Sequence, residues 1–310
     1  MNILVTGAAG FIAFHLIEDL LKNQQNKIIG IDNFYSGTRE NINYLKSCDK
    51  NNLFTFIEVD IRDFETINKI IKENNITQVY HLAAIVSVQE SISNPLLSNE
   101  VNVKGTLNIL EASRQNKVKR VVFSSSAAVY GDEPTLPKDE NSLTKPISPY
   151  GYEKLMSEQY MKLYSKLYNV ETVILRYFNV YGPRQSFKSD YSGVISIFEK
   201  KFKNDEILNI YGDGKQYRDF VYVKDVSKAN IKAMNTPNIS GEIFCIGTGN
   251  KTSINNVVEV LNIKYDKNIE AKYLSQRDGD IKESVCKNDK LKRVLDIDNF
   301  VKFEEGVLYL

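Results

Sequence analysis

The segment that decides the fold is Asn2-Ile3-Leu4-Val5-Thr6-Gly7-Ala8-Ala9-Gly10-Phe11-Ile12-Ala13, at the start of the chain. Its short apolar run predicts a β-strand, a glycine-rich turn follows at once, and a helical pattern begins at Phe11. Such a turn brings backbone amides close to a pyrophosphate, which favours the binding of a dinucleotide. The spacing of Gly7, Gly10 and Ala13 is three and three rather than two and three, but Ala13 is still small enough for close packing of helix and sheet.

Acidic residues end the next two predicted strands. Asp32 lies about 20 residues beyond the glycine turn, where a carboxylate can accept hydrogen bonds from the adenosine ribose and repel a 2′-phosphate. This position favours NAD over NADP. Arg39 lies further along and is either a solvated charge or a group that complicates this choice. Asp60 and Ile61, at the end of the third strand, are placed to flank the adenine.

Short apolar runs alternate with amphipathic stretches through the first half of the chain. Apolar strands separated by helices predict a parallel sheet that is covered on both faces and joined by right-handed crossovers. We therefore expect an α/β protein with a doubly wound parallel sheet of the Rossmann type. The predicted strands are residues 2–6, 27–32, 53–60, 78–83, 120–125 and 172–177.

A second, smaller α/β lobe is predicted from Gly182 onward, where the rhythm of strands and helices changes. We assign residues 1–180 to an NAD-binding domain and residues 181–310 to a substrate-binding domain. The second domain begins with a polar stretch and a predicted helix at residues 194–203. Residues 219–247 contain a helical and a strand-like pattern that can pass back to the first domain.

The composition argues against several classes of protein. The 310 residues are 42% apolar, which is enough for a substantial core. Lys and Arg number 40 and Asp and Glu number 39, so the net charge of +1 argues against a surface that holds nucleic acid or an anionic membrane. No stretch approaches the ~20 apolar residues of a membrane span. We expect a cytoplasmic protein.

Neither a metal site nor a disulfide framework is expected. The cysteines at positions 48, 245 and 286 are odd in number and lack the spacing of metal ligands, and only His15 and His81 could supplement them. We interpret the cysteines as reduced structural thiols. His81 is interpreted as a packed residue at a strand end.

Tyr150 and Lys154 form a candidate proton-transfer pair. They stand four residues apart, so a helix places both on one face. Pro149 suits the first position of that helix, and an apolar stripe at helical spacing extends it. The stripe consists of Met156, Tyr160, Leu163 and Leu167. A free phenol titrates near ~10, but a neighbouring ammonium and a positive nicotinamide ring both favour the phenolate, which points to redox chemistry on an alcohol.

The loop Phe123-Ser124-Ser125-Ser126-Ala127-Ala128-Val129-Tyr130-Gly131 follows the fifth predicted strand, at the sheet edge where ligands bind in such folds. With the glycine turn and the Tyr–Lys pair, it resembles the extended short-chain dehydrogenase/reductase family over nearly the entire chain. Within that family the chain is similar to nucleotide-sugar 4-epimerases of the UDP-galactose and UDP-N-acetylglucosamine type. Two further motifs carry the resemblance: Arg176-Tyr177-Phe178-Asn179-Val180-Tyr181-Gly182-Pro183 and Gly212-Asp213-Gly214-Lys215-Gln216-Tyr217-Arg218-Asp219.

This resemblance implies NAD-dependent 4-epimerisation of a UDP-hexose through a transient 4-keto sugar. Tyr150 would take the proton from the sugar 4-hydroxyl while hydride passes from C4 to NAD. Ser126 would hydrogen-bond the reacting oxygen, and Lys154 would hold the nicotinamide ribose. The keto sugar would then turn over while its nucleotide stays anchored, and the same cofactor would return the hydride to the opposite face.

The resemblance also implies which residues bind each ligand. For the cofactor these are Gly7, Gly10, Phe11, Ile12, Asp32, Asn33, Phe34, Ser36, Gly37, Asp60, Ile61, Leu82, Ala83, Ala84, Val86, Asn102, Ser124, Tyr150, Lys154, Tyr177 and Phe178. For the substrate they are Ser87, Ser126, Tyr150, Asn179, Val194, Arg218, Arg277 and Ser284. Asn179 and the two arginines would hold the diphosphate, since arginine forks suit phosphate oxygens. The small Ser284 would leave room for an N-acetyl group.

Two other functions stay open. One is a nucleotide-sugar 4,6-dehydratase or decarboxylase of the same family, although Ala127 and Ala128 stand where such enzymes generally carry acidic or threonine side chains. The other is a non-catalytic NAD-binding regulator, against which the joint presence of Ser126, Tyr150 and Lys154 argues. The resemblance further implies a homodimer formed through predicted helices at residues 97–116 and 151–168.

Overall fold

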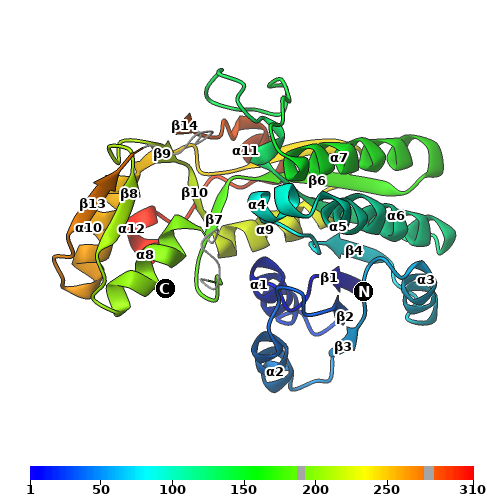
Figure 1. Ribbon diagram of the computed structural model, residues 1–310. Coiled ribbons are helices and arrows are strands. Elements are labelled where there is room, and N and C mark those ends of the chain that lie inside the picture. The colour runs from blue at the N-terminus through cyan, green and yellow to red at the C-terminus, as the bar shows by residue number, and fades with distance from the viewer. Residues whose placement is uncertain (187–192, 276–282) are drawn as a thin grey trace.

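The computed structural model describes residues 1–186, 193–275 and 283–310. Seven strands form one parallel sheet in the order β11-β6-β5-β4-β1-β2-β3. Helices lie on both sides of this sheet, and a smaller group of strands and helices stands beside it (Figure 1). The strands of the sheet are Asn2–Thr6 (β1), Lys27–Asp32 (β2), Phe54–Glu58 (β3), Gln78–His81 (β4), Arg120–Ser126 (β5), Glu171–Tyr177 (β6) and Glu242–Ile246 (β11).

The predicted doubly wound sheet is confirmed. β1 and β2 have the predicted bounds, whereas β3 and β4 each end two residues early. The reason at β4 is local: the amides of Leu82 and Ala83 donate to the Thr6 side-chain hydroxyl at 3.1 and 3.0 Å, so the chain leaves the sheet there. Early departure from the sheet forms the loop edge at which ligands bind in this fold.

Each face of the sheet is covered by helices with their own apolar core. On one face, α1, α2, α9 and α11 bury side chains such as Leu16 and Ala229. On the other, α3, α6 and α7 bury Ile67, Ile109 and Met161. These helices are Phe11–Leu20 (α1), Arg39–Cys48 (α2), Phe64–Glu73 (α3), Gly105–Gln115 (α6), Pro149–Tyr168 (α7), Val223–Asn235 (α9) and Asp289–Leu295 (α11).

The second lobe has a separate aromatic and aliphatic core around Phe198, Phe202, Leu208 and Phe303. Its helices are Val194–Lys203 (α8), with the predicted bounds, Ile254–Tyr265 (α10) and Phe303–Leu308 (α12). Its strands are Asn179–Tyr181 (β7), Leu208–Tyr211 (β8), Tyr217–Arg218 (β9), Phe220–Tyr222 (β10), Thr252–Ser253 (β12), Ala271–Leu274 (β13) and Glu283–Ser284 (β14). They pair as β12-β9-β14, β13-β8 and β10-β7.

The chain runs between the lobes more than once. After β10 pairs with β7, α9 packs against α1, and β11 joins the large sheet beside β6, with Ile243 opposite Ile174. Residues 219–247 therefore contribute a helix and an edge strand to the first lobe. The domain boundary at residues 180 and 181 stays a prediction.

Within the described ranges, no helix has the length and apolar character needed to cross a membrane. The same residues contain no group of three or more His, Cys, Asp or Glu side chains that could hold a metal ion. All three cysteines are free thiols, with Cys48 exposed and the other two buried.

Candidate active site

The glycine turn joins β1 to α1, as predicted. Gly7 has a φ of +69°, and a Cβ there would lie 2.8 Å from the main-chain nitrogen of Ala83. The Gly10 N–H donates to the Gly7 carbonyl at 2.9 Å, and Gly10 is the residue that precedes the first turn of α1. Gly7 and Gly10 have no side chains, so a pyrophosphate can approach the amides of the helix N-terminus.

Asp32 binds the glycine turn through its carboxylate. Its Oδ2 accepts a hydrogen bond from the Ala9 amide at 3.1 Å, and its Oδ1 accepts one from the Phe34 amide at 2.6 Å. Burial raises the pKa of Asp32, and these amide hydrogen bonds act in the opposite direction. An acceptor held beside the turn in this way fits the ribose hydroxyls of NAD.

Arg39 is engaged by the protein itself. Its guanidinium forms an ion pair of 3.0 Å with Glu58, and its central carbon lies 4.2 Å from the centre of the Phe34 ring. Both charged side chains are exposed. Of the two interpretations of Arg39, this contact supports a balanced surface charge over a group that selects a 2′-phosphate.

The predicted adenine side contains one accessible and one buried residue. Asp60 accepts a hydrogen bond of 2.9 Å from Asn33 and forms an ion pair of 2.8 Å with Arg62. Ile61 is buried, and its Cδ1 lies 2.5 Å from where a Cβ on Gly105 would stand. Of these two residues, only Asp60 is therefore accessible to a ligand. The loop beside it approaches the glycine turn closely, since a Cβ on Gly37 would lie 2.6 Å from the Ala9 Cβ, while Ser36 is exposed.

The loop at residues 82–86 is held from behind by Asn102. The Asn102 side chain accepts from the Ile85 amide at 2.8 Å and donates to the Ile85 carbonyl at 2.9 Å and to Glu153 at 2.7 Å. Asn102 is 2% exposed. Protein partners therefore use its side chain fully, so it positions the loop, of which Ala84 and Val86 stay accessible.

The predicted helix at residues 97–116 is interrupted at Asn102. A π-helical turn at Glu100–Lys104 separates Pro95–Asn99 (α5) from α6. The Asn102 carbonyl accepts side-chain hydrogen bonds from Thr106 at 2.6 Å and Ser157 at 3.0 Å. Such widened turns occur often at functional sites, and this one places the Asn102 amide against the loop at residues 82–86.

His81 is a neutral packed residue, as predicted. Burial lowers its pKa to about 3. Its Nδ1 and Nε2 lie 2.8 Å from the Thr6 hydroxyl and 2.9 Å from the Thr106 hydroxyl. Because Thr106 donates its own proton to the Asn102 carbonyl, Nε2 carries the histidine proton and Nδ1 accepts from Thr6.

Tyr150 and Lys154 lie on the buried face of α7, as their spacing predicts. The helix begins at Pro149, and the Ser148 hydroxyl caps it by accepting from the Gly151 amide at 3.2 Å. The apolar stripe turns the other way: Met156, Leu163 and Leu167 are all exposed. The buried face of α7 is mostly polar from Tyr150 to Glu158 and apolar at Met161 and Tyr164, and it carries the proton-transfer pair into the protein.

Burial dominates the electrostatics of the pair. Burial raises the pKa of Tyr150 to about 12, and its hydrogen bond with Ser126 acts in the opposite direction. Burial lowers the pKa of Lys154 to about 8, opposed by the charges of Glu153 and Glu158. Burial is the largest cause of both shifts. The expectation that the ammonium and a nicotinamide ring together favour the phenolate stays a prediction.

A buried ion pair stands behind Lys154. The Arg176 guanidinium donates to Glu158 at 2.6 and 2.9 Å, and the Ser125 hydroxyl donates to the same carboxylate at 2.6 Å. Arg176 also donates to the Tyr130 hydroxyl at 3.0 Å. These contacts fix α7 against β5 and β6, so they set the positions from which Tyr150 and Lys154 act.

Three of the predicted cofactor residues, Ser124, Tyr177 and Phe178, are buried. The Ser124 hydroxyl lies 2.9 Å from the Tyr177 hydroxyl, which also bonds the Asn230 side chain at 2.8 Å. Phe178 is buried beside Tyr130, with ring centres 6.4 Å apart. The Ser124 carbonyl accepts a hydrogen bond of 2.9 Å from the Lys154 ammonium. The side chains of Ser124, Tyr177 and Phe178 therefore contact other protein residues.

Three predicted substrate residues lie close together at the junction of the lobes. Ser284 in β14 pairs with Arg218 in β9. The next residue, Asp219, accepts a hydrogen bond of 3.1 Å at its main-chain oxygen from the Asn179 amide. Asn179 lies 40 positions before Asp219, and Ser284 lies about 66 positions after Arg218, yet the members of each pair are neighbours in space. A shared diphosphate site requires such proximity.

The remaining predicted substrate residues are dispersed. Val194 begins α8, and Ser87 caps the helix Val88–Ser93 (α4) by accepting from the Glu90 amide at 3.1 Å. Arg277 lies outside the described residues. A cavity of about 380 Å³ is lined by residues 136–137, 248–251, 285–289 and 292, and by none of the predicted site residues.

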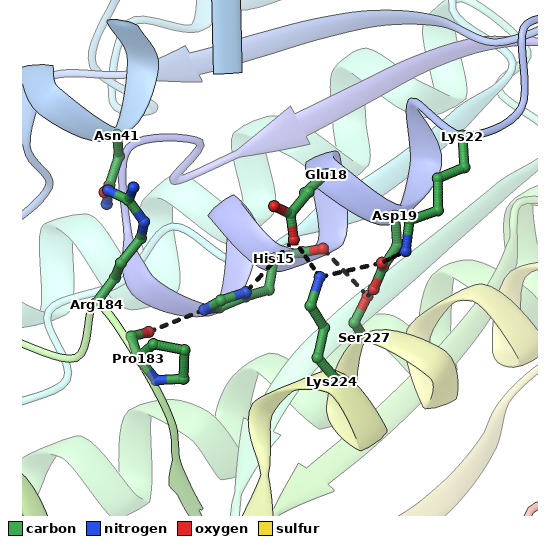
Figure 2. Close-up of polar contacts among 9 residues, drawn as sticks. All are labelled: His15, Glu18, Asp19, Lys22, Asn41, Pro183, Arg184, Lys224 and Ser227. Carbon is green, nitrogen blue, oxygen red and sulfur yellow. Dashed lines mark hydrogen bonds and ion pairs between the residues drawn. The ribbon is translucent and has the colours of Figure 1, made fainter. Parts of the chain in front are cut away.

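Polar contacts link α1 to α9 and to the segment after β7 (Figure 2). His15 in α1 donates from Nε2 to the Pro183 carbonyl at 2.9 Å. Lys224 in α9 lies between Glu18 and Asp19 and pairs with both. Arg184 donates to Asn41 at 3.1 Å, and its guanidinium lies 4.4 Å from the centres of the Phe14 and Tyr44 rings. Phe11 and Ile12, predicted cofactor residues, pack against the core of the second lobe.

Sequence reasoning missed the buried charges that support the site. The sequence indicates no role for Glu153, Glu158 or Asp219, yet none of them is more than 2% exposed. The spacing offered one signal: Glu158 lies four residues after Lys154, so a helix puts it on the same buried face. No comparable local pattern marks the contacts of Asp219.

Comparison with known proteins agrees with this geometry. Residues 3–247 match the model of the NAD dependent epimerase/dehydratase family. A UDP-glucose 4-epimerase from Mycolicibacterium smegmatis is 34% identical over 99% of this chain and 96% of its own length. The crystal structure of Thermotoga maritima UDP-glucose 4-epimerase with UDP-glucose has a TM-score of 0.92 and 37% identity, over 100% of this chain and 97% of that one.

A second solved structure differs in its sugar. The UDP-N-acetylglucosamine 4-epimerase of Methanobrevibacter ruminantium, in complex with UDP-N-acetylmuramic acid, has a TM-score of 0.92 and 37% identity, over 99% of this chain and 96% of that one. The family match covers most of the chain, and both crystal structures span nearly all of it. The chain therefore belongs to the NAD dependent epimerase/dehydratase family, as an extended short-chain dehydrogenase/reductase whose cofactor is NAD.

Proposed function

We propose that this enzyme interconverts UDP-hexoses that differ at C4, through a transient 4-keto sugar. The observation that carries the proposal is the joining of Ser126, Tyr150 and Lys154 at the carboxyl edge of the sheet. These residues lie on β5 and α7, next to the loop that packs on the glycine turn. The similarity to UDP-sugar 4-epimerases supports the same assignment.

In the proposed reaction, the Tyr150 phenolate removes the proton from the sugar 4-hydroxyl, and the Ser126 hydroxyl holds the same oxygen. Bound NAD supplies a hydride acceptor and a positive nicotinamide ring. That charge favours the phenolate, which the buried protein surroundings disfavour. After the keto sugar turns over, Tyr150 returns the proton to the 4-oxygen, so the acid and the base are one residue.

The turnover step requires a firm hold on the nucleotide and a weak hold on the hexose. We assign the diphosphate to Asn179 and Arg218, since guanidinium groups bind phosphate oxygens with two hydrogen bonds. Ser284, opposite Arg218 in the β9–β14 pair, borders the hexose in this proposal. Its small side chain leaves space for an N-acetyl group at C2. We propose UDP-glucose and UDP-N-acetylglucosamine as the substrates to compare.

The experiment that tests this proposal incubates the purified protein with each UDP-hexose and analyses the product by NMR and mass spectrometry. We expect a C4 epimer of unchanged mass, with no net consumption of NAD. Loss of water or carbon dioxide would instead identify the dehydratase or decarboxylase alternative. Protein that holds NAD but converts no UDP-, dTDP- or GDP-sugar would identify the non-catalytic regulator. Ser126→Ala removes one hydroxyl from the reacting site, so we expect it to form the same product more slowly.

We also propose that the enzyme is a homodimer that buries the outer face of α7. This face exposes Met156, Leu163 and Leu167, and Leu96 in the adjacent helix α5 is 81% exposed. Contiguous apolar patches of this kind usually mark interaction sites. Light scattering should give the mass of a dimer, and Leu163→Glu with Leu167→Glu should give a monomer. A monomeric wild-type protein would refute this arrangement.

A further inference from the structure

Asp219 is a buried carboxylate at the junction of three segments of the chain. It stands between β9 and β10 and is 0% exposed. Its Oδ1 accepts from the Thr248 amide at 2.8 Å and the Thr248 hydroxyl at 2.7 Å. Its Oδ2 accepts from the amides of Gly249 at 2.8 Å and Cys286 at 3.0 Å. Four donors fill the four acceptor positions of the carboxylate, so Asp219 has no position left for a ligand.

The four donors come from two places that flank the substrate residues. Two residues of the turn directly after β11, at the edge of the large sheet, supply three of them. Cys286, two residues after Ser284 in β14, supplies the fourth. The carboxylate of Asp219 therefore connects the seven-stranded sheet to β14, the strand that contains Ser284.

The main chain of Asp219 extends the same connection. Its carbonyl accepts hydrogen bonds from both the amide and the side chain of Asn179, at 3.1 and 3.3 Å. Arg218 is its neighbour in sequence and lies opposite Ser284 in the sheet. All three substrate residues assigned to the junction are thus one or two steps from Asp219.

Close packing makes this junction stiff. A Cβ on Gly247 would lie 2.8 Å from the Asp219 Oδ2 and 2.6 Å from the Cys286 Cβ. There is no room between these groups for a larger side chain. A shift of the Asp219 side chain would therefore move β14 or the turn after β11.

We propose that Asp219 is a positioning residue for the nucleotide diphosphate, an inference that rests on the proposed function. It touches no substrate atom. Its hydrogen bonds hold Arg218, Asn179 and Ser284 at a fixed place relative to the sheet edge where Tyr150 acts. Anchoring the nucleotide while the keto sugar turns over requires this relation, because the hold on the substrate comes from the diphosphate contacts.

The test compares three variants as NAD-loaded enzymes. Asp219→Asn keeps the shape of the side chain but replaces two acceptor positions by N–H donors. Thr248→Val removes a single hydroxyl donor, and Thr248→Ser keeps that donor and serves as the matched control. UDP binding is measured by calorimetry, KM and kcat with the UDP-hexose that wild type converts, and NAD content by absorbance.

We expect Asp219→Asn to weaken UDP binding and raise KM by about tenfold or more, since hydrogen bonds to charged groups are the strong ones. NAD content and kcat should change much less. Thr248→Val should shift UDP affinity in the same direction by a smaller factor, and Thr248→Ser should bind UDP as wild type does.

UDP affinity unchanged in a folded, NAD-loaded Asp219→Asn enzyme would overturn the inference. If Asp219→Asn does not fold, wild-type UDP affinity in Thr248→Val would overturn it instead. A lower melting temperature with unchanged KM would show a purely structural role and would also overturn it. Failure of the proposed function is separate, because it appears as a wild-type enzyme that neither binds UDP nor converts a UDP-hexose.

Discussion

The Lys154 ammonium nitrogen lies 5.8 Å from the centre of the Tyr150 ring, and both residues are buried on the same face of α7. The ammonium donates a hydrogen bond of 2.9 Å to the Ser124 carbonyl. Its contribution to proton transfer is therefore a charge held nearby in a buried site. A positive charge favours the phenolate, whereas burial, the largest cause, raises the pKa of Tyr150 to about 12.

Replacing the Lys154 charge should shift the pH dependence of the enzyme. In Lys154→Met, the phenolate loses a stabilising charge, so the alkaline rise in kcat/KM moves to higher pH and the rate at neutral pH falls by roughly 100-fold. Lys154→Arg, which keeps a charge, should recover part of the rate. The pH–rate profiles of the three proteins check this. An unshifted profile in Lys154→Met would show that the ammonium does not act on Tyr150.

The buried pair of Arg176 and Glu158 should contribute strongly to stability once one partner is removed. Arg176→Met leaves the Glu158 charge buried without its partner, so we expect a loss of about 3–5 kcal/mol in the free energy of unfolding. Burial alone would lower the pKa of Arg176, but its hydrogen bonds to Glu158 raise that pKa overall, so Arg176 stays charged. Arg39→Ala, which breaks an exposed pair with Glu58, should cost at most about 1 kcal/mol in urea unfolding. Equal losses in the two variants would contradict this account.

Acid should destabilise the protein through His81. Its folded pKa of about 3 lies below the ordinary value of 6.5, so its contribution is fully present above pH 6.5 and is lost as the pH falls toward 3. Within that window the slope from one histidine approaches about 1.4 kcal/mol per pH unit. His81→Gln should show a shallower fall in its free energy of unfolding over the same range. Parallel curves for both proteins would rule out His81 as the cause.

The bond between His15 and the Pro183 carbonyl should stabilise the contact between the lobes. His15→Phe leaves that partly buried carbonyl without its donor, so we expect a loss of about 1 kcal/mol in the free energy of unfolding. His15→Gln can still donate from its side-chain amide and should lose less. Chemical denaturation of both variants with NAD bound provides the comparison. The contact would be unimportant if His15→Phe were as stable as wild type.

The sequence predicts most of the first lobe because its signals are local. β1 and β2 in this lobe, like α8 in the second lobe, have the bounds that apolar runs and turn residues indicate, and the Tyr150 and Lys154 pair follows from helical spacing alone. The apolar stripe on α7 shows the limit of such patterns. Its period identifies the helix correctly, but burial of the opposite face is decided by tertiary contacts.

Those contacts also explain what sequence reasoning could not supply. Asp219 binds Thr248 and Cys286, which are 29 and 67 positions away, and no local pattern encodes such pairs. The π-helical turn at Asn102 depends on Ser157 and the loop at residues 82–86 in the same way. The raised pKa of Tyr150 follows from burial, which becomes known only when α7 is placed against the sheet.

The most direct measurement of the central claim is the rate at which Tyr150→Phe interconverts the two C4 epimers of the UDP-hexose that wild type uses. The variant removes one oxygen and leaves NAD content and UDP affinity as readouts of an intact site. We predict a rate at least about 100-fold below wild type, with both readouts unchanged. A rate equal to that of wild type would contradict the assignment of Tyr150 as the group that moves the proton.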